Sequence, residues 1–184
     1  MTLIQGKIRI IGGQWRSRLL TFPEHPDLRP TSDRIRETVF NWLEQDLSGL
    51  RCLDLFAGSG ALGFEAASRG AAQVVMVDND ARVYKALKEN KEKLQAMQVE
   101  LLLMNALSFM KSDARKFDVI FLDPPYRLDL LPGLMPLLPP HLEQNGLVYS
   151  ESRGIWNLDE QWKIHRGAKA GTVRYQLLEL AHYG

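Results

Sequence analysis

The segment LRCLDLFAGSGALG (residues 50–63) decides the fold, because an apolar run ends there in a glycine-rich turn. A short apolar run of this kind is typical of a strand buried in a parallel sheet. Helix-forming residues follow as far as Gly70, which fits a helix C-terminus. Gly58, Gly60 and Gly63 stand in the order G-x-G-x-x-G. Such a turn either admits a ligand close to the backbone or simply reverses the chain tightly.

Strand-like and helix-like patterns alternate along the rest of the chain. The further expected strands are residues 73–78, 99–104, 117–122 and 146–152. Helical segments separate them, although the last, LLPGLMPLLPPHL, is broken by prolines and predicts only a short or kinked helix. Residues 162–180 read as an antiparallel hairpin. The alternation predicts an α/β fold, with a mostly parallel sheet of order 3-2-1-4-5 covered by helices on both faces.

The first 50 residues follow a different pattern. KIRIIGG and RSRLLTF, around Gly12 and Gly13, predict a small β-hairpin. The next segment offers Thr31, Ser32 and Asp33 as candidate helix N-caps. It continues with apolar residues at helical spacing, which predict an amphipathic helix packed on the sheet: Ile35, Val39, Trp42 and Leu43.

Charge is distributed unevenly between the two parts of the chain. The net charge is +1, but residues 1–36 contain seven basic and three acidic side chains, which leaves the remainder at −3. A basic end on a nearly neutral body is typical of a surface that contacts a phosphate backbone. A solvated, arginine-rich hairpin is the alternative interpretation.

Composition limits the classes of protein to consider. The chain has 184 residues, of which 45% are apolar and 24% charged, so we expect one globular domain with at most a small appendage. No apolar run approaches the length of a membrane span, and the N-terminus lacks a signal-peptide pattern. Cys52 is the single cysteine, and the four histidines show no metal-ligand spacing. We therefore expect a cytoplasmic protein, monomeric by default for its size, with no metal and no membrane partner.

Two aspartates extend the glycine turn into a candidate cofactor site. Asp78 lies 20 residues after Gly58, at the end of the next expected strand, where a carboxylate can accept ribose hydroxyl hydrogen bonds. It could equally cap the helix that begins near Asp80. Asp54 would oppose a pyrophosphate at this turn but suits a cationic group, such as the ammonium of S-adenosylmethionine. The alternative is a buried carboxylate that binds loop amides.

The segment FDVIFLDPPY (residues 117–126) ends an apolar strand in an unusual corner. Asp123 and Pro124 each precede a proline and are therefore held extended, and the prolines donate no hydrogen bond. The Asp123 carboxylate and Pro124 carbonyl could grip both hydrogens of an exocyclic amine, and Tyr126 could stack on a flipped base. A simple strand-ending turn is the alternative. In the predicted sheet this corner and the glycine turn meet where the strand order reverses.

These motifs together resemble a known family. The Asp-Pro-Pro-Tyr corner resembles the amino-group branch of the class I S-adenosylmethionine-dependent methyltransferases. The wider pattern is similar to the RsmD family of bacterial 16S rRNA guanine-N2 methyltransferases, on four segments: IRIIGGQWRSRLL, RPTSDRIRETVFNWL, LDLFAGSGALGFEAASRGA and VIFLDPPY. The resemblance covers nearly the whole chain. It implies a Rossmann-like fold with a seven-stranded sheet of order 3-2-1-4-5-7-6, in which residues 31–184 form the methyltransferase domain and residues 1–30 a basic hairpin extension.

The resemblance also implies a reaction and its site residues. The cofactor would be S-adenosylmethionine, and the substrate a guanosine of 16S rRNA in the small ribosomal subunit or its assembly intermediate. The implied cofactor-binding residues are Asp54, Phe56, Ala57, Gly58, Ser59, Gly60, Asp78, Asn79, Asn105, Ala106 and Asp123. The implied target-amine site consists of Asp123, Pro124, Pro125 and Tyr126. The expected rRNA phosphate contacts are Arg9, Arg16, Arg18, Arg34 and Arg36, although Arg34 could instead face the cofactor carboxylate.

Three other functions fit part of the sequence. An amino methyltransferase acting on adenine N6 or a glutamine side chain would share the Asp-Pro-Pro-Tyr chemistry. An NAD-dependent oxidoreductase could use the glycine turn, but it would leave that corner without a purpose. A catalytically inactive RNA-binding module is the third alternative. The chain leaves only about 50 residues outside the expected sheet, fewer than the ~100–150 of a usual extra domain, so no separate target-recognition domain is expected.

Overall fold

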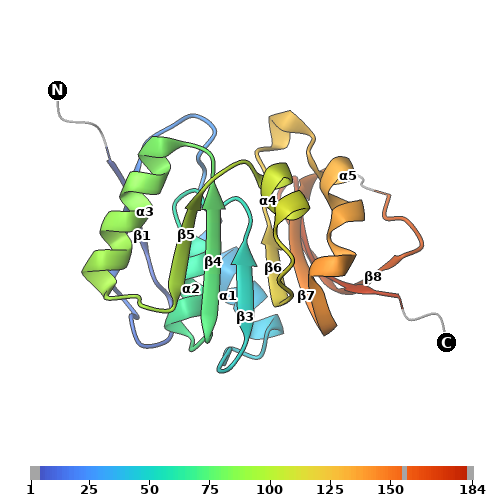
Figure 1. Ribbon diagram of the computed structural model, residues 1–184, viewed down its shortest axis with the longest axis horizontal. Coiled ribbons are helices and arrows are strands. Elements are labelled where there is room, and N and C mark those ends of the chain that lie inside the picture. The colour runs from blue at the N-terminus through green and yellow to red at the C-terminus, as the bar shows by residue number, and fades with distance from the viewer. Residues whose placement is uncertain (1–4, 155–156, 182–184) are drawn as a thin grey trace.

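A computed structural model describes residues 5–154 and 157–181; the ends of the predicted extension and domain, residues 1–4 and 182–184, lie outside the described residues. Its main feature is a seven-stranded sheet of order β5-β4-β3-β6-β7-β9-β8 (Figure 1). The strands are β3 (Arg51–Asp54), β4 (Gln73–Asp78), β5 (Val99–Leu103), β6 (Phe117–Leu122), β7 (Leu142–Arg153), β8 (Trp162–Ala170) and β9 (Val173–Leu180). The first five are parallel, and β9 pairs antiparallel with both β7 and β8. The predicted fold class and strand order are confirmed.

Helices cover both faces of the sheet, which explains why its central strands are mainly apolar. The helices are α1 (Asp33–Trp42), α2 (Ala61–Ser68), α3 (Ala81–Leu94), α4 (Ala106–Ser112) and α5 (Leu131–Leu134). Residues of α1, α2 and α3 share one buried cluster with Cys52 and Val74, whereas α4 and α5 contribute to a second cluster with Leu53 and Val75. Neighbouring strand residues thus point to opposite faces, and each face is buried.

Short helical turns occupy the proline-rich segment between β6 and β7, as the sequence predicts. The helix α5 lasts a single turn and is followed by two 3-10 turns, η2 (Met135–Leu137) and η3 (Pro139–His141). Another 3-10 turn, η1 (Tyr126–Leu128), begins directly after Pro124 and Pro125, which follow β6. In the described part of the chain, no helix is both long and apolar enough to cross a membrane.

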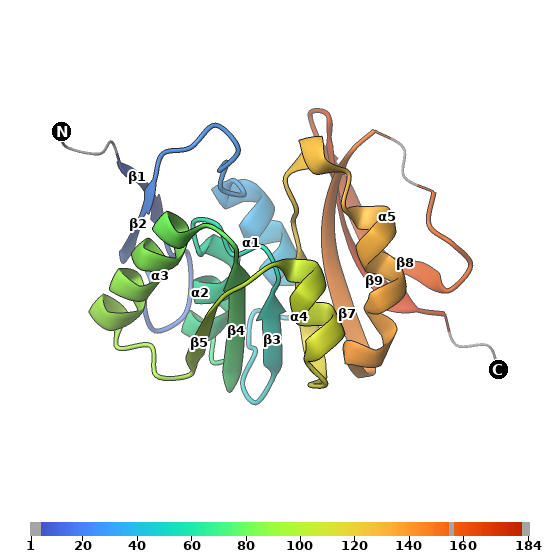
Figure 2. The same cartoon turned by 45° about the horizontal axis from the view of Figure 1, so that its top comes forward.

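The predicted N-terminal hairpin forms a separate two-stranded sheet, β1 (Gln5–Arg9) with β2 (Leu19–Pro23). Figure 2 shows it beside α3. The Asn90 side chain of that helix accepts from the Thr21 amide at 3.2 Å and donates to the Thr21 carbonyl at 2.8 Å. Trp15, in the connection between the strands, is buried in the same core cluster as α1 and α2. The Trp15 side chain therefore packs inside the protein.

Candidate active site

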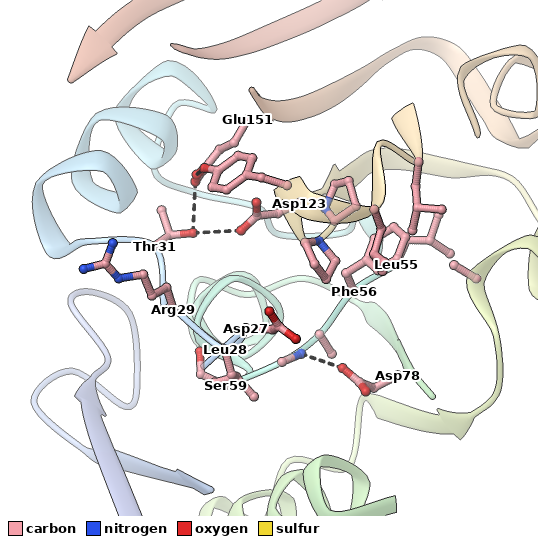
Figure 3. Close-up of a pocket in the computed structure, with 18 of the residues that line it drawn as sticks. Asp27, Leu28, Arg29, Thr31, Leu55, Phe56, Ser59, Asp78, Asp123 and Glu151 are labelled. Atoms are coloured by element: carbon pink, nitrogen blue, oxygen red, sulfur yellow. Dashed lines mark hydrogen bonds between the residues drawn. The ribbon is translucent and has the colours of Figure 1, made fainter. Parts of the chain in front are cut away.

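A cleft of about 1090 Å³ opens at the carboxyl ends of β3, β4 and β6 (Figure 3). The glycine turn after β3 and the Asp-Pro-Pro-Tyr corner after β6 both line it. The predicted cofactor residues that line the cleft are Asp54, Phe56, Ala57, Gly58, Ser59, Asp78, Asn79, Asn105, Ala106 and Asp123. Pro124, Pro125 and Tyr126 line it as well, whereas Gly60 does not. The fold thus brings two sequence-distant motifs together at the point where the strand order reverses.

The three glycines of the turn serve different purposes. Gly58 has φ +53°, and a Cβ added there would approach nothing closer than 3.9 Å, so its open side faces the cleft. Gly60 has φ +81°, and an added Cβ would come within 2.6 Å of the Phe64 ring. At Gly63 the added atom would come within 2.8 Å of Met76. Gly60 and Gly63 therefore permit close packing of α2, while Gly58 leaves space for a ligand.

Asp54 is buried at the base of the cleft, with 1% of its surface exposed. Its Oδ2 accepts a 3.0 Å hydrogen bond from the Gly63 amide. Among the described residues its Oδ1 has no hydrogen-bond partner. The amides of Gly63 and Phe56 both act to lower the pKa of the Asp54 carboxyl. Burial dominates and raises the pKa of Asp54 to about 7. The hydrogen bond to the Gly63 amide agrees with the alternative of a buried carboxylate that binds loop amides, and the remaining oxygen is free to contact a cationic group.

Asp78 fastens the glycine turn to the end of β4. Its Oδ2 accepts from the Gly58 amide at 3.0 Å, the hydrogen bond drawn at Asp78 in Figure 3. Its Oδ1 accepts from the Asp80 amide at 2.9 Å. Asp80, rather than Asp78, provides the N-cap of α3. Burial raises the pKa of Asp78. Each carboxylate oxygen has a second lone pair, so Asp78 can still accept hydrogen bonds from a ligand.

Asn105 plays a structural role that the sequence did not reveal. Its Oδ1 caps α4 by accepting from the amides of Leu107 at 2.9 Å and Ser108 at 3.3 Å. Its side-chain amide group can still donate to a ligand at this edge of the cleft, where Ala106 follows it.

Three hydroxyl groups surround one buried carboxylate beside the Asp-Pro-Pro-Tyr corner. Glu151, 5% exposed, accepts from Thr31 at 3.0 Å, from Tyr126 at 2.8 Å and from Tyr149 at a short 2.5 Å. The Thr31 hydroxyl also lies 3.3 Å from Oδ2 of Asp123. Figure 3 shows Thr31 between Asp123 and Glu151. Burial, followed by the nearby Glu151 charge, raises the pKa of Asp123 well above its usual range.

Sequence reasoning missed this group. Thr31 was one of three candidate N-caps for α1, but the cap is Ser32, whose hydroxyl accepts from the Ile35 amide. Glu151 stands in the strand-like segment GLVYSES, on a strand whose residues are largely buried. A carboxylate at such a position requires hydrogen-bond donors, and this requirement was the available signal. Its partners lie up to 120 residues away, which no local pattern reveals.

Tyr126 is held in a fixed orientation. Its hydroxyl donates to Glu151, and the Arg153 guanidinium carbon lies 4.6 Å from the ring centroid. With 37% of its surface exposed, the ring borders the cleft, and Arg153 covers one of its faces. A stacked base therefore has only the opposite face of Tyr126 available.

An ion pair joins the segment before α1 to the corner after β6. Arg127 donates to both oxygens of Asp27, at 2.8 and 2.6 Å. This hydrogen bond holds the pKa of Asp27 below its usual value. Residues 25–32 line the cleft on this side, and they include Arg29. Arg34 does not line the cleft, which leaves no support for its alternative role at the cofactor carboxylate.

The prediction that Arg36 contacts rRNA phosphate is wrong. Its side chain is fully buried and forms ion pairs with Asp33 at 2.6 Å and with Glu65 at 3.4 Å. It also donates to the carbonyls of Arg9 and Thr31. The guanidinium therefore joins the hairpin, α1 and α2 in the interior. The remaining predicted RNA contacts are exposed: Arg9, Arg16, Arg18 and Arg34.

No arrangement of three or more His, Cys, Asp or Glu side chains suited to a metal ion occurs within residues 5–154 and 157–181. Cys52 is buried in the sheet, and burial raises its thiol pKa above the usual range, so its sulfur is a packing group.

The sequence and the structure are similar to those of known methyltransferases. Residues 8–179 match the family described as conserved hypothetical protein 95. The ribosomal RNA small subunit methyltransferase D of Escherichia coli K12 is 43% identical over 179 residues, which cover 95% of this chain and 90% of that protein. The structure of a putative methyltransferase, yhhF, from Escherichia coli is 42% identical in sequence, with a TM-score of 0.85. The similarity covers 95% of this chain and 98% of that chain. An RNA methyltransferase from Salinibacter ruber, solved with S-adenosyl-L-homocysteine, is 18% identical with a TM-score of 0.65. The similarity covers 81% of this chain and 92% of that chain, and it shows the shared fold alone.

The fold, the cleft at the reversal of strand order and these similarities define a class I methyltransferase. The match to the family extends from the N-terminal hairpin to the last strand. The chain belongs to the family described as conserved hypothetical protein 95, and it is similar to the ribosomal RNA small subunit methyltransferase D of Escherichia coli over 90% of that protein.

Proposed function

We propose that the protein transfers a methyl group from S-adenosylmethionine to the exocyclic N2 amine of a guanosine in 16S rRNA. The substrate would be the small ribosomal subunit or its assembly intermediate, and the protein would act on it in the cytoplasm as a monomer. The observation that carries this proposal is that the glycine turn and the Asp-Pro-Pro-Tyr corner line one cleft. The name of the Escherichia coli relative supports it.

The residues of the cleft suit the cofactor. S-adenosylmethionine would supply a methyl group made electrophilic by a positively charged sulfur. The free oxygen of Asp54 suits its ammonium, and Asp78 suits the ribose hydroxyls. The residues that follow β4 and β5 suit the adenine edge: Asn79, Asn105 and Ala106. The glycine turn would surround the methionine part through Phe56, Ala57, Gly58 and Ser59.

The corner suits the target amine. The Asp123 carboxylate and the Pro124 carbonyl would accept the two hydrogens of the N2 amine and direct its lone pair toward the methyl group. Pro125 has no amide hydrogen and a fixed φ, so it stiffens this row of acceptors. The free face of Tyr126 would stack on the extruded guanine. Rate acceleration would come mainly from positioning, which can supply about 7–11 kcal/mol.

Gly58→Ala should lose affinity for S-adenosylhomocysteine by about tenfold or more, because its methyl group would occupy the open side of the turn. Binding can be measured by calorimetry. Gly49→Ala is the matched control, since Gly49 has φ +82° and equally open surroundings but does not line the cleft. Both variants should destabilise the fold by about 1–2 kcal/mol. Equal affinities in the two variants would remove Gly58 from the cofactor site.

Affinity for S-adenosylhomocysteine should fall about tenfold between pH 8 and pH 6, because Asp54 has its pKa raised to about 7 and loses its charge in this window. Only the ionised carboxylate attracts the ligand ammonium, so protonation weakens binding as the pH falls. Calorimetric titrations at several pH values measure this change. Asp54→Asn should bind weakly with little dependence on pH, and a pH-independent wild-type affinity would exclude Asp54 as the ammonium partner.

Arg16→Gln combined with Arg18→Gln should weaken binding to small subunits and lower the slope of log affinity against log salt by about two, since about one counterion is released per phosphate contact. Binding measured over a range of salt concentrations gives this slope. The matched control is Lys111→Gln with Lys116→Gln, which removes two exposed charges near α4. If both double variants change the slope equally, the hairpin is not the RNA contact surface.

The proposed function can be tested by supplying radiolabelled S-adenosylmethionine with undermodified small subunits, naked DNA or total protein. We expect label to enter the rRNA of the subunits. Label in DNA or in glutamine side chains would instead favour the other amino methyltransferase functions.

A further inference from the structure

We propose that Thr31 and Glu151 act with Asp123 as a relay that removes the proton lost by the target amine during methyl transfer. This inference rests on the proposed function. It adds two positioning residues to the reaction and gives Asp123 a second task besides gripping the amine.

The reaction creates a proton that must leave. When the amine nitrogen forms its bond to the methyl carbon, the carbon–sulfur bond breaks and its electron pair stays on sulfur. The nitrogen then carries a positive charge and one hydrogen too many. Asp123 is the carboxylate assigned to that hydrogen, so its Oδ atoms are the first acceptor.

Thr31 provides the connection to a second acceptor. Its hydroxyl oxygen lies 3.3 Å from Asp123 Oδ2 and 3.0 Å from Glu151 Oε1. Because a hydroxyl has one hydrogen, it can donate to only one carboxylate at a time. It can accept the proton from Asp123 while it passes its own hydrogen to Glu151, so the charge moves away from the base without movement of the backbone.

Glu151 suits the role of final acceptor. Among the described residues it has no ion-pair partner, and its hydrogen-bond partners are the hydroxyls of Thr31, Tyr126 and Tyr149. The pKa of each tyrosine is raised by burial and by the Glu151 charge, so both phenols remain protonated donors. Glu151 therefore offers a second carboxylate, joined to Asp123 through the Thr31 hydroxyl and contacted by neutral donors.

The other charged groups near Asp123 come from several elements. Asp54, at the end of β3, and Glu151, on β7, both raise the pKa of Asp123, whereas the Thr31 hydrogen bond lowers it. Arg153 lies over the ring of Tyr126. These opposite influences of Glu151 and Thr31 give the relay a distinctive pH signature.

The test is the pH dependence of single-turnover methylation of small subunits. Glu151→Gln should slow the reaction about tenfold or more and move its acidic limb to lower pH, because the neighbouring charge is gone. Thr31→Val should slow it comparably but move the limb to higher pH, because the hydrogen bond is lost. Thr31→Ser should restore the wild-type profile. Affinity for S-adenosylhomocysteine should stay within about threefold in all three variants, which excludes a collapsed cleft.

A merely structural role predicts a different result. If Glu151→Gln and Thr31→Val slow the reaction equally at every pH, or leave its rate unchanged, the relay is wrong. Asp123→Asn gives a further check, because the amide oxygen can still grip the amine but cannot take a proton; full turnover in this variant would also overturn the relay.

The relay can be separated from the proposed function by a measurement without substrate. Carbon-13 NMR of the side-chain carboxyls should show Asp123 titrating above the ordinary aspartate range, and at a lower pH in Glu151→Gln. An unchanged midpoint would overturn the coupling on which the relay depends. Absence of methyl transfer by the wild-type protein would instead defeat the proposed function.

Discussion

Replacing Asp123 by alanine should reduce methyl transfer to small subunits about a thousandfold or more, because the variant loses an acceptor for the amine and its pre-arranged geometry. The free energy of unfolding should not fall. Burial raises the pKa of Asp123, so its ionised form costs stability above its unfolded pKa, and alanine removes that cost. The Thr31 hydroxyl would then donate fully to Glu151.

Affinity for S-adenosylhomocysteine separates this effect from damage to the cofactor site. We expect it to change less than about threefold in Asp123→Ala, since Asp54 and Asp78 keep their partners at the glycine turn. Turnover should be measured with saturating cofactor. Substantial activity in Asp123→Ala would show that the amine is held elsewhere.

Replacing Arg36 by methionine should lower the free energy of unfolding by about 3–5 kcal/mol, because it leaves the buried Glu65 carboxylate without its compensating charge from α1. Glu65 also accepts from the amides of Ile11 and Gly12, at 2.9 and 2.8 Å, and from Arg69. Loss of Arg36 therefore weakens the junction between the hairpin, α1 and α2. Urea unfolding followed by circular dichroism measures the effect.

Arg34→Met is the matched control, because Arg34 lies two residues earlier on the same helix with its side chain exposed. It should change the stability by no more than about 0.5 kcal/mol. If Arg36→Met left the stability unchanged and weakened binding to small subunits, Arg36 would contact RNA and would not be an interior ion-pair partner.

The sequence predicts the sheet because its signals are local. Apolar runs, the glycine turn and prolines mark each element, and the βαβ rules then limit the order of the strands. The glycine turn and the Asp-Pro-Pro-Tyr corner are contiguous motifs, so their meeting at the reversal of strand order follows from the topology.

Contacts between distant segments explain what the sequence does not predict. Arg36 looks like part of a basic surface, but Val39 and Phe40 share its buried face of α1 and Glu65 lies opposite. Thr31 looks like a helix cap, yet it bridges Asp123 and Glu151. Such polar groups are recognised only when their partners are known, because burial makes hydrogen bonding obligatory without fixing which residues supply it.

The central claim is that this cleft methylates the N2 amine of guanine. The most direct test is to incubate the protein with undermodified small subunits and S-adenosylmethionine, digest the 16S rRNA to nucleosides and identify the product by mass spectrometry. We predict one additional N2-methylguanosine per subunit, absent with Asp123→Ala. Methylation at adenine N6, or an unchanged nucleoside composition, would contradict the assignment.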